Sequence, residues 1–266
     1  MKTYRTIHYS CAEHVGWLTL ARPDALNAYT TEMCDELVDA LGRFQADDDT
    51  RVLVLTGEGR AFCAGGDVRN TDEVEMAHRR QLGHGTVMRE GVHRVCRLLH
   101  GLDKPTIAMV NGVAVAGGLT LALLCDLRIA GAGARLGDTS GRVGLLPDEG
   151  GAWLFPRVMG MEAALRMTLL GEIYDAQRAQ ELGLVGEVVP DEELRTHTAA
   201  LAAALAARAP LAVRVAKKLM VRAAGTSFDH ALGDAEFAVD IVNDSADVAE
   251  GITAFVEKRT PRFEGR

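Results

Sequence analysis

Apolar and polar residues alternate along the chain in patterns typical of both strands and helices. Between residues 3 and 189, short apolar runs of the strand type alternate with segments of helical spacing. One helix begins at Thr30 or Thr31 and places Met33 and Leu37 on its apolar face. We predict strands at residues 3–9, 15–20, 51–56, 105–110, 127–130 and 184–189, and further helices at residues 86–99 and 117–124.

This order of strands and helices predicts the fold class. Strands separated by helices form βα units around a mostly parallel sheet, and their crossover connections are almost always right-handed. We therefore expect an α/β protein whose sheet coils rather than meanders. Residues 69–83 are polar and lack regular spacing, so we expect a mobile loop or a frayed helix there.

After Pro190 the pattern changes to helices alone. We place a boundary near residue 195, which divides the chain into a core of residues 1–195 and a helical region of residues 196–266. Alanine-lined faces pack closely, so this region either forms subunit contacts or covers the sheet. The segments with helical spacing are residues 199–207, 213–222, 230–242 and 246–258.

Composition and charge narrow the function classes. The 266 residues are 48% hydrophobic and 25% charged, as in ordinary globular proteins. A net charge of −8 argues against nucleic acid as a partner, because phosphate binding needs a basic face. The chain shows no long apolar run and no apolar signal segment, so we expect a cytoplasmic protein that does not span a membrane. The five cysteines form no CxxC pair, so we expect free thiols and no metal site.

Two glycine-rich segments beside predicted strands carry the candidate chemistry. They are residues 61–67, Ala-Phe-Cys-Ala-Gly-Gly-Asp, and residues 111–118, Asn-Gly-Val-Ala-Val-Ala-Gly-Gly. Glycine lets the backbone approach a ligand, and free N–H groups at a helix start attract negative charge. Two such turns facing each other would form an oxyanion hole. Taken singly, each turn is also compatible with a plain connection between a strand and a helix.

These segments, with others in the same order, resemble the signatures of the enoyl-CoA hydratase/isomerase (crotonase) family. The resemblance covers essentially the whole chain. It implies a crotonase-like spiral of ββα units, a C-terminal helical trimerisation region and an acyl-CoA thioester as substrate. It also implies a homotrimer or hexamer, and no cofactor beyond the coenzyme A moiety of the substrate. The matching segments are residues 22–28, 61–67, 111–118, 145–147, 150–151, 156–157 and 255–263.

The resemblance also implies positions for the site residues. The thioester oxygen would lie between the backbone N–H groups of Gly66 and Gly117. Lys258 would contact a coenzyme A phosphate, with a neighbouring subunit as a further possibility, or is otherwise a solvated lysine near a helix C-terminus. The residues expected to line bound coenzyme A are Ala25, Ala64, Gly65, Gly66 and Asp67, of which Asp67 also suits a structural role.

The sequence departs from the hydratases of this family at both glutamate positions. Thr120 and Ser140 stand where those enzymes carry their two glutamates. Hydration needs one group to activate water and another to deliver a proton. Neither hydroxyl is a competent base near neutral pH, so the substitutions argue against ordinary hydration.

A pair of acids after Pro147 offers another chemistry. Some isomerases of the family carry their single acid where Asp148 stands here. One carboxylate can remove a proton from C2 and return it at C4 while the enolate oxygen is held. We therefore predict double-bond isomerisation with Asp148 as the base and Glu149 as second choice. Alternatively, Asp148 caps a helix that starts near Gly151, and Glu149 stabilises the dipole of that helix.

Other assignments stay open on sequence alone. Asp138 is a third candidate acid, although a turn role fits it better, and Trp153 and Phe155 either wall the acyl pocket or belong to the core. The family alternatives are hydration with an unusual base, thioester hydrolysis, decarboxylation and dehalogenation. An alternative of another class is a coenzyme A-binding protein without turnover. The identity of the acyl group does not follow from the sequence.

Overall fold

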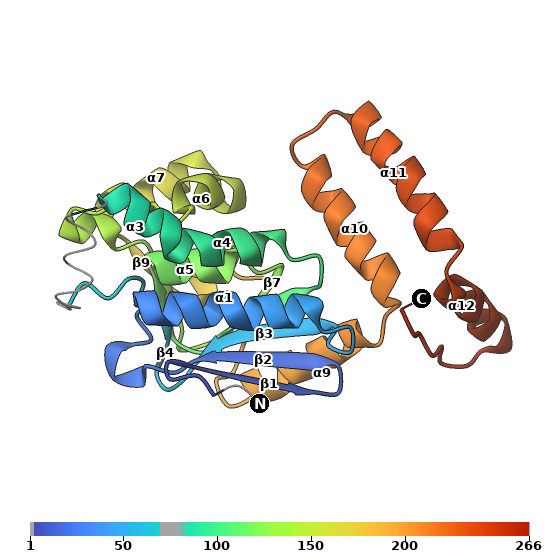
Figure 1. The fold of residues 1–266 in the computed structure, drawn as a ribbon. Helices are drawn as coiled ribbons and strands as arrows, with labels where there is room; N and C mark the ends of the chain where they lie inside the picture. Colours follow the sequence, from blue (N-terminus) through green and yellow to red (C-terminus); the bar gives the residue numbers. More distant parts are fainter. Residues whose placement is uncertain (1–2, 70–80, 82, 266) are drawn as a thin grey trace.

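The fold is that of a computed structural model, which describes residues 3–69, 81 and 83–265. Most of the loop predicted at residues 69–83 lies outside the described residues. Within them, the chain forms two β-sheets, with helices on both sides of the larger one (Figure 1). The predicted α/β class is confirmed.

The larger sheet has six strands in the order β1-β2-β3-β5-β7-β10. Only the β1–β2 pair is antiparallel, as expected for a sheet built from crossover units. The first strand begins later than predicted, because the amides of Arg5 and Thr6 donate to the Glu36 carboxylate instead. The strands are β1 (Ile7–Ala12), β2 (Val15–Leu20), β3 (Val52–Gly57), β5 (Thr106–Val110), β7 (Leu127–Gly131) and β10 (Glu187–Val189).

A second sheet of four strands, in the order β4-β6-β8-β9, was not predicted. Each of its strands has three residues, too few to show a hydrophobic period. The chain passes from β3 to β4, from β5 to β6 and from β7 to β8, so each pair begins in the large sheet and ends in the small one. Helices follow each pair, which confirms the spiral of ββα units. The strands are β4 (Ala61–Cys63), β6 (Val113–Val115), β8 (Arg135–Gly137) and β9 (Ile173–Asp175).

The strands of the large sheet are buried on both faces. In β3, Leu53 and Leu55 face the cluster around α1 (Thr31–Ala46), whereas Val52 and Val54 face the opposite cluster. The predicted start of α1 is confirmed, because the Thr30 side chain accepts a hydrogen bond from the Met33 amide at 3.3 Å. The other helices up to residue 181 are α3 (His84–Glu90), α4 (Val92–Gly101), α5 (Gly117–Leu123), α6 (Gly151–Met159), α7 (Met161–Leu170) and α8 (Ala176–Glu181), with 3₁₀ turns η1 (Pro23–Ala25) and η2 (Ser140–Val143).

The helix predicted at residues 86–99 is in fact two helices. Gly91 separates α3 from α4 with φ −98° and ψ −116°, outside the helical region. α4 then packs on α1 through Val92, Val95 and Leu99, which are all buried. The glycine therefore lets the chain change direction so that the apolar face of α4 reaches the core.

The first C-terminal helix, α9 (Leu194–Ala206), belongs with the sheet. Its residues Leu194, Ala202 and Ala206 are buried against Val52, Val54 and other residues of the large sheet. The boundary proposed at residue 195 cuts through the start of this helix. The helices after residue 206 contribute little to either core cluster, so α9 packs with the sheet, and the boundary near residue 195 stays a prediction.

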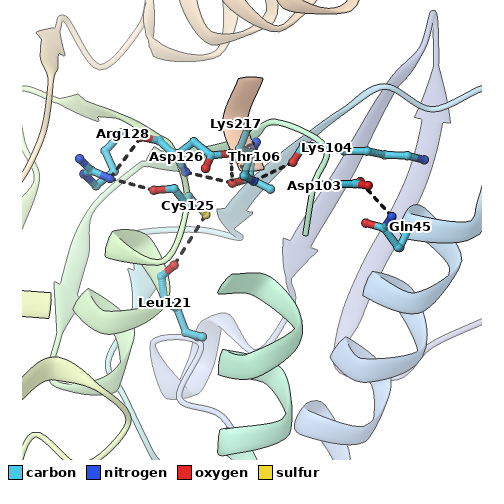
Figure 2. Close-up of polar contacts among 9 residues, drawn as sticks. All are labelled: Gln45, Asp103, Lys104, Thr106, Leu121, Cys125, Asp126, Arg128 and Lys217. Carbon is cyan, nitrogen blue, oxygen red and sulfur yellow. Dashed lines mark hydrogen bonds and ion pairs between the residues drawn. The ribbon is translucent and has the colours of Figure 1, made fainter. Parts of the chain in front are cut away.

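The last three helices stand beyond the sheet (Figure 1). They are α10 (Pro210–Ala223), α11 (Phe228–Asn243) and α12 (Ala246–Glu257). Polar contacts attach α10 to the core: Lys217 Nζ lies 2.7 Å from Asp126 Oδ2 and 2.9 Å from the Lys104 carbonyl oxygen (Figure 2). Arg214 Nη2 contacts Asp103 Oδ2 at 2.8 Å.

No single helix in the described part of the chain combines the length and the apolar composition needed to cross a membrane. Only α9 and α10 taken together reach that length and composition, and they are bent by 102° at the break between them.

Candidate active site

The two glycine-rich turns meet. Gly65 has φ +91°, and a Cβ built on it would lie 3.2 Å from the Gly117 nitrogen and 3.1 Å from Ala116 Cβ. A side chain there would meet both this crowding and an unfavourable backbone conformation. Glycine at residue 65 therefore allows the first turn to touch the start of α5.

The backbone N–H groups of Gly66 and Gly117 have no acceptor within the described structure. Neither donates to a protein acceptor among residues 3–69, 81 and 83–265. Gly117 is the first residue of α5, where helical N–H groups have no partner within the helix. Both glycines also border the same hydroxyl, because a Cβ on Gly66 would lie 3.5 Å from Tyr29 Oη and one on Gly117 only 2.6 Å from it.

The Glu149 carboxyl lies against Gly117. A Cβ on Gly117 would be 2.8 Å from Glu149 Cδ, and Glu149 is only 8% exposed. The Tyr29 hydroxyl donates a hydrogen bond to Oε1 of Glu149, and Oε2 is buried without a partner among the described residues. One carboxylate oxygen is thus held, while the other, beside the two glycine turns, has no partner in the described part of the chain.

Burial controls the ionisation of this carboxyl. It raises the pKa of Glu149 from 4.5 to about 7, and the negative charge of Asp148 acts in the same direction, while the hydrogen bond from Tyr29 opposes the rise. Burial and the Glu149 charge also hold the pKa of the Tyr29 hydroxyl well above its usual range, so that it stays a donor. A carboxyl with a pKa near 7 suits proton transfer at neutral pH.

Asp148 lies beside this carboxyl but at the surface. Its side chain is exposed, and its backbone carbonyl oxygen lies 2.9 Å from His93 Nε2. The alternative role of Asp148 as a helix cap is wrong, because the N-cap of α6 is Gly150, which makes no side-chain cap. The structure therefore places the buried Glu149 carboxyl against Gly117, with the exposed Asp148 beside it.

The hydroxyls at the hydratase positions lie in the interior. Thr120 is fully buried within α5, and its Oγ1 has no partner in the described part of the chain. Ser140 is 5% exposed at the start of η2. Its amide donates to Asp138 Oδ1 at 3.0 Å, which confirms the turn role of Asp138.

A backbone hydrogen bond joins the two segments expected to bind coenzyme A. The Ala64 amide donates to the Leu26 carbonyl at 3.0 Å, which places residue 64 beside the turn that contains Ala25. Asp67 forms an ion pair with Arg22 at 2.9 Å. Burial raises the pKa of Asp67, but the hydrogen bond from Arg22 outweighs this effect and holds the pKa below its usual range. This ion pair fits a structural role for Asp67.

Lys258 lies apart from these segments in a single copy of the chain. It ends α12 with φ +56° and is exposed. Figure 1 places α12 beyond α10, away from β4 and α5. Any contact between Lys258 and a ligand at the glycine turns would therefore have to come from a neighbouring subunit.

The two aromatic candidates have different environments. Phe155 is 2% exposed and packs against Gly151, so its assignment to the core is confirmed. Trp153 is half-exposed, between His100 and the guanidinium of Arg157, which lies 4.0 Å from the ring centroid.

The residue that sequence reasoning missed is Tyr29. Tyr29 directly follows the segment at residues 22–28 that resembles the family signature. This adjacency is the one sequence feature that could have indicated a role for Tyr29 in the site. A separate cavity of about 490 Å³ contains none of the predicted site residues. The described residues contain no group of histidine, cysteine, aspartate and glutamate side chains arranged to hold a metal ion, and their five cysteines are free thiols.

Comparison with known proteins shows which proteins the whole chain is similar to. The 1,2-epoxyphenylacetyl-CoA isomerase of Escherichia coli is 38% identical over 251 residues, covering 94% of each chain. The (E)-benzylidenesuccinyl-CoA hydratase of Thauera aromatica is 34% identical and covers 96% of this chain and 97% of its own. The crystal structure of an enoyl-CoA hydratase from Bacillus anthracis superposes with a TM-score of 0.91 at 32% identity, covering 98% of this chain and 100% of that one.

A family model described as enoyl-CoA hydratase/isomerase matches residues 11–266. This match spans both glycine turns, the acid pair and the C-terminal helices. The chain therefore belongs to the enoyl-CoA hydratase/isomerase family.

Proposed function

We propose that the protein moves a double bond within an acyl-CoA thioester by way of an enolate. A carboxylate takes a proton from C2 of a 3-enoyl-CoA, and the electron pair delocalises onto the thioester oxygen. The N–H groups of Gly66 and Gly117 stabilise that negative charge. The same carboxyl group then returns the proton to C4, which gives the 2-enoyl-CoA without added water or a redox partner.

The observation that carries this proposal is the Glu149 carboxyl against Gly117. Its burial, its pKa of about 7 and an Oε2 that has no partner among the described residues equip it to accept and release one proton near neutral pH. We therefore assign the proton transfers to Glu149. Asp148 is exposed beside it, so in this proposal its charge tunes Glu149.

Hydration is the competing reaction, and the names of related proteins include hydratases as well as an isomerase. The proposal favours isomerisation because Thr120 and Ser140 replace the acidic pair expected of a hydratase. Neither hydroxyl can serve as the general base that activates water at neutral pH. The Glu149 carboxyl is the one shown against Gly117, and the proposed isomerisation needs one base.

The test uses 3-enoyl-CoA and 2-enoyl-CoA with purified protein in deuterated water. We expect double-bond migration and no 3-hydroxyacyl product, with deuterium entering C2 and C4 whenever the carboxyl proton exchanges with solvent between its removal and its return. Glu149→Gln should lower the rate by at least about 100-fold, the usual contribution of a general acid–base group. Asp148→Asn should mainly shift the pH dependence of the rate. Glu162→Gln, which changes an exposed side chain on α7, is the matched control.

Three outcomes would contradict the proposal. Accumulation of the 3-hydroxyacyl product would indicate hydration. Equal rates for the wild type and Glu149→Gln, with a large loss in Asp148→Asn, would move the base to Asp148. Binding of coenzyme A without turnover on a broad acyl panel would indicate a non-catalytic binding protein.

We also propose that the chain works as a homotrimer or hexamer. Large apolar side chains stand exposed on α11 and α12, among them Phe237 at 78% and Phe255 at 85% exposed. Exposed apolar faces of this kind are typical of subunit interfaces. Sedimentation analysis tests this proposal, and a monomer at micromolar concentration would contradict it.

A further inference from the structure

We infer that Tyr29 is a positioning residue that holds the Glu149 carboxyl at the glycine turns and leaves Oε2 as the oxygen that exchanges the proton. The catalytic part of this inference rests on the function proposed above. The structural part, which concerns how Tyr29 controls Glu149, can be tested without any substrate.

The backbone of Tyr29 is fixed by the first glycine turn. Its amide donates to the Gly65 carbonyl at 2.9 Å, and its carbonyl accepts from the Asp67 amide at 3.0 Å. These two bonds flank Gly66, whose own N–H stays free of partners among the described residues. The pairing that shapes the turn therefore also sets the position of the Tyr29 ring.

The ring in turn reaches the second turn and the acid. Tyr29 is 9% exposed, and its hydroxyl donates to Glu149 Oε1, which stands beside Gly117. Tyr29 thus joins the first glycine turn, the second glycine turn and the acid through one buried side chain. Loss of its hydroxyl would leave Oε1 without this donor and free the carboxyl to rotate.

The direction of the hydrogen bond selects the reactive oxygen. The hydroxyl stays protonated near neutral pH and is the donor, because burial and the Glu149 charge hold the pKa of Tyr29 well above its usual value. An oxygen that accepts a hydrogen bond is the less favourable one to protonate. The proton therefore goes to Oε2, which is buried and has no partner among the described residues.

Among the described residues, no other side chain near Glu149 replaces this donor, and the backbone amide of Glu149 is the further group whose hydrogen bond favours the charged form. The exposed Asp148 raises the pKa of Glu149 rather than lowering it. The thiols of Cys63 on β4 and Cys96 on α4 have pKa values raised by burial to about 12, so both are neutral. His93 on α4 contacts the backbone carbonyl of Asp148. Within these neighbours, Tyr29 is the side chain whose hydrogen bond favours the charged form of Glu149.

Removal of the hydroxyl should consequently raise the pKa of Glu149 above its value of about 7. A buried glutamate with a raised pKa favours folding below its unfolded pKa of about 4.5, and that contribution is lost as pH rises through the folded pKa. Tyr29→Phe should therefore extend this loss to higher pH than in the wild type.

The experiment measures unfolding free energy against pH in four proteins: the wild type, Tyr29→Phe, Glu149→Gln and the double variant. The difference between each protein and its Glu149→Gln counterpart isolates the proton linked to Glu149. In the pair that keeps Tyr29, we expect this difference in unfolding free energy to change with pH until about pH 7 and then to level off. In the pair with Tyr29→Phe, we expect the change to continue well above pH 7. Tyr29→Met removes the same hydroxyl and serves if the phenylalanine variant does not fold.

Activity gives the second readout. In Tyr29→Phe the rising limb of the rate–pH profile should move to higher pH. The rate at low pH should then fall up to about tenfold for every pH unit that the limb moves, and it should recover at high pH. Tyr174→Phe is the matched control, since it removes a tyrosine–glutamate hydrogen bond of 2.8 Å to Glu172, outside the candidate site. It should leave both readouts unchanged.

The inference would be overturned if the stability difference changed over the same pH range with and without the Tyr29 hydroxyl. If that pH range moves but no isomerisation occurs in any protein, the proposed function fails while the role of Tyr29 in holding Glu149 stands. If isomerisation occurs but Tyr29→Phe lowers the rate equally at every pH, Tyr29 does not act through Glu149.

Discussion

The junction of the two glycine turns and the C-terminal helices are built in opposite ways. At the junction, Tyr29, Glu149 and Gly117 come from distant segments and are all buried. In α10 to α12, almost all side chains are partly or fully exposed, and large apolar residues face outward. Ion pairs such as Lys217–Asp126 attach these helices to the core (Figure 2).

The contrast shows how one chain serves two requirements. A site that transfers protons needs groups held within hydrogen-bond reach, which dense packing of short turns provides. A subunit interface needs apolar surface that is exposed to solvent in the single chain. Substitutions in the first region should therefore alter chemistry, and those in the second should alter association.

The largest effect is expected from Gly117→Ala. The new Cβ would lie 2.6 Å from Tyr29 Oη and 2.8 Å from Glu149 Cδ, so both groups must move. A displacement of about 1 Å at a reacting centre can lower a rate on the order of 100-fold. The isomerisation assay measures this, with Gly42→Ala as the control, because no atom of the described residues lies within 4 Å of a Cβ at Gly42. Equal loss in both variants would contradict the proposed geometry.

The next effect concerns Glu149 and pH. Its folded pKa of about 7 lies above the ordinary 4.5, so its charged form disfavours folding. Wild-type stability should fall relative to Glu149→Gln as pH rises from about 4.5 to 7, by an amount on the order of 1–3 kcal/mol. Urea titrations across this range measure the difference. Parallel curves for the two proteins would show that Glu149 is not buried as described.

A third prediction addresses the C-terminal helices. Phe237→Glu places a charge on an apolar face that is 78% exposed in one copy. If a second copy covers this face, the loss of a buried phenylalanine should weaken association by about tenfold to 100-fold, equivalent to about 1.5–3 kcal/mol. Sedimentation detects this, and the unfolding free energy of the single chain should change little because Phe237 is exposed there. Unaltered association would place the interface elsewhere.

The smallest effect is expected at the attachment of α10. Lys217→Met removes the ion pair with Asp126 and the hydrogen bond to the Lys104 carbonyl. The side chains of Lys217 and Asp126 are 13% and 28% exposed, so we expect a loss of about 1 kcal/mol, more than an isolated surface pair contributes. Hydrogen exchange should rise first in α10. Uniform destabilisation of the whole chain would argue against a local attachment.

Several features of the fold followed from local sequence alone. The cap at Thr30 and the apolar face of α1 depend on residues within one helix, so spacing predicts them. Glycines at residues 65, 66 and 117 indicated two turns that approach a ligand, and both turns carry free N–H groups in the described structure. In contrast, the three-residue strands of the small sheet were missed, because so short a segment has no period of its own.

What the sequence by itself determined is the family, the α/β class, the two glycine turns and the presence of acids after Pro147. What only the tertiary structure decided is which acid faces those turns and which residue holds it. Tyr29 and Glu149 are 120 positions apart, and their hydrogen bond exists only because the spiral brings both to the start of α5. Burial, and with it the raised pKa of Glu149, is a property of the packed chain that no local pattern contains.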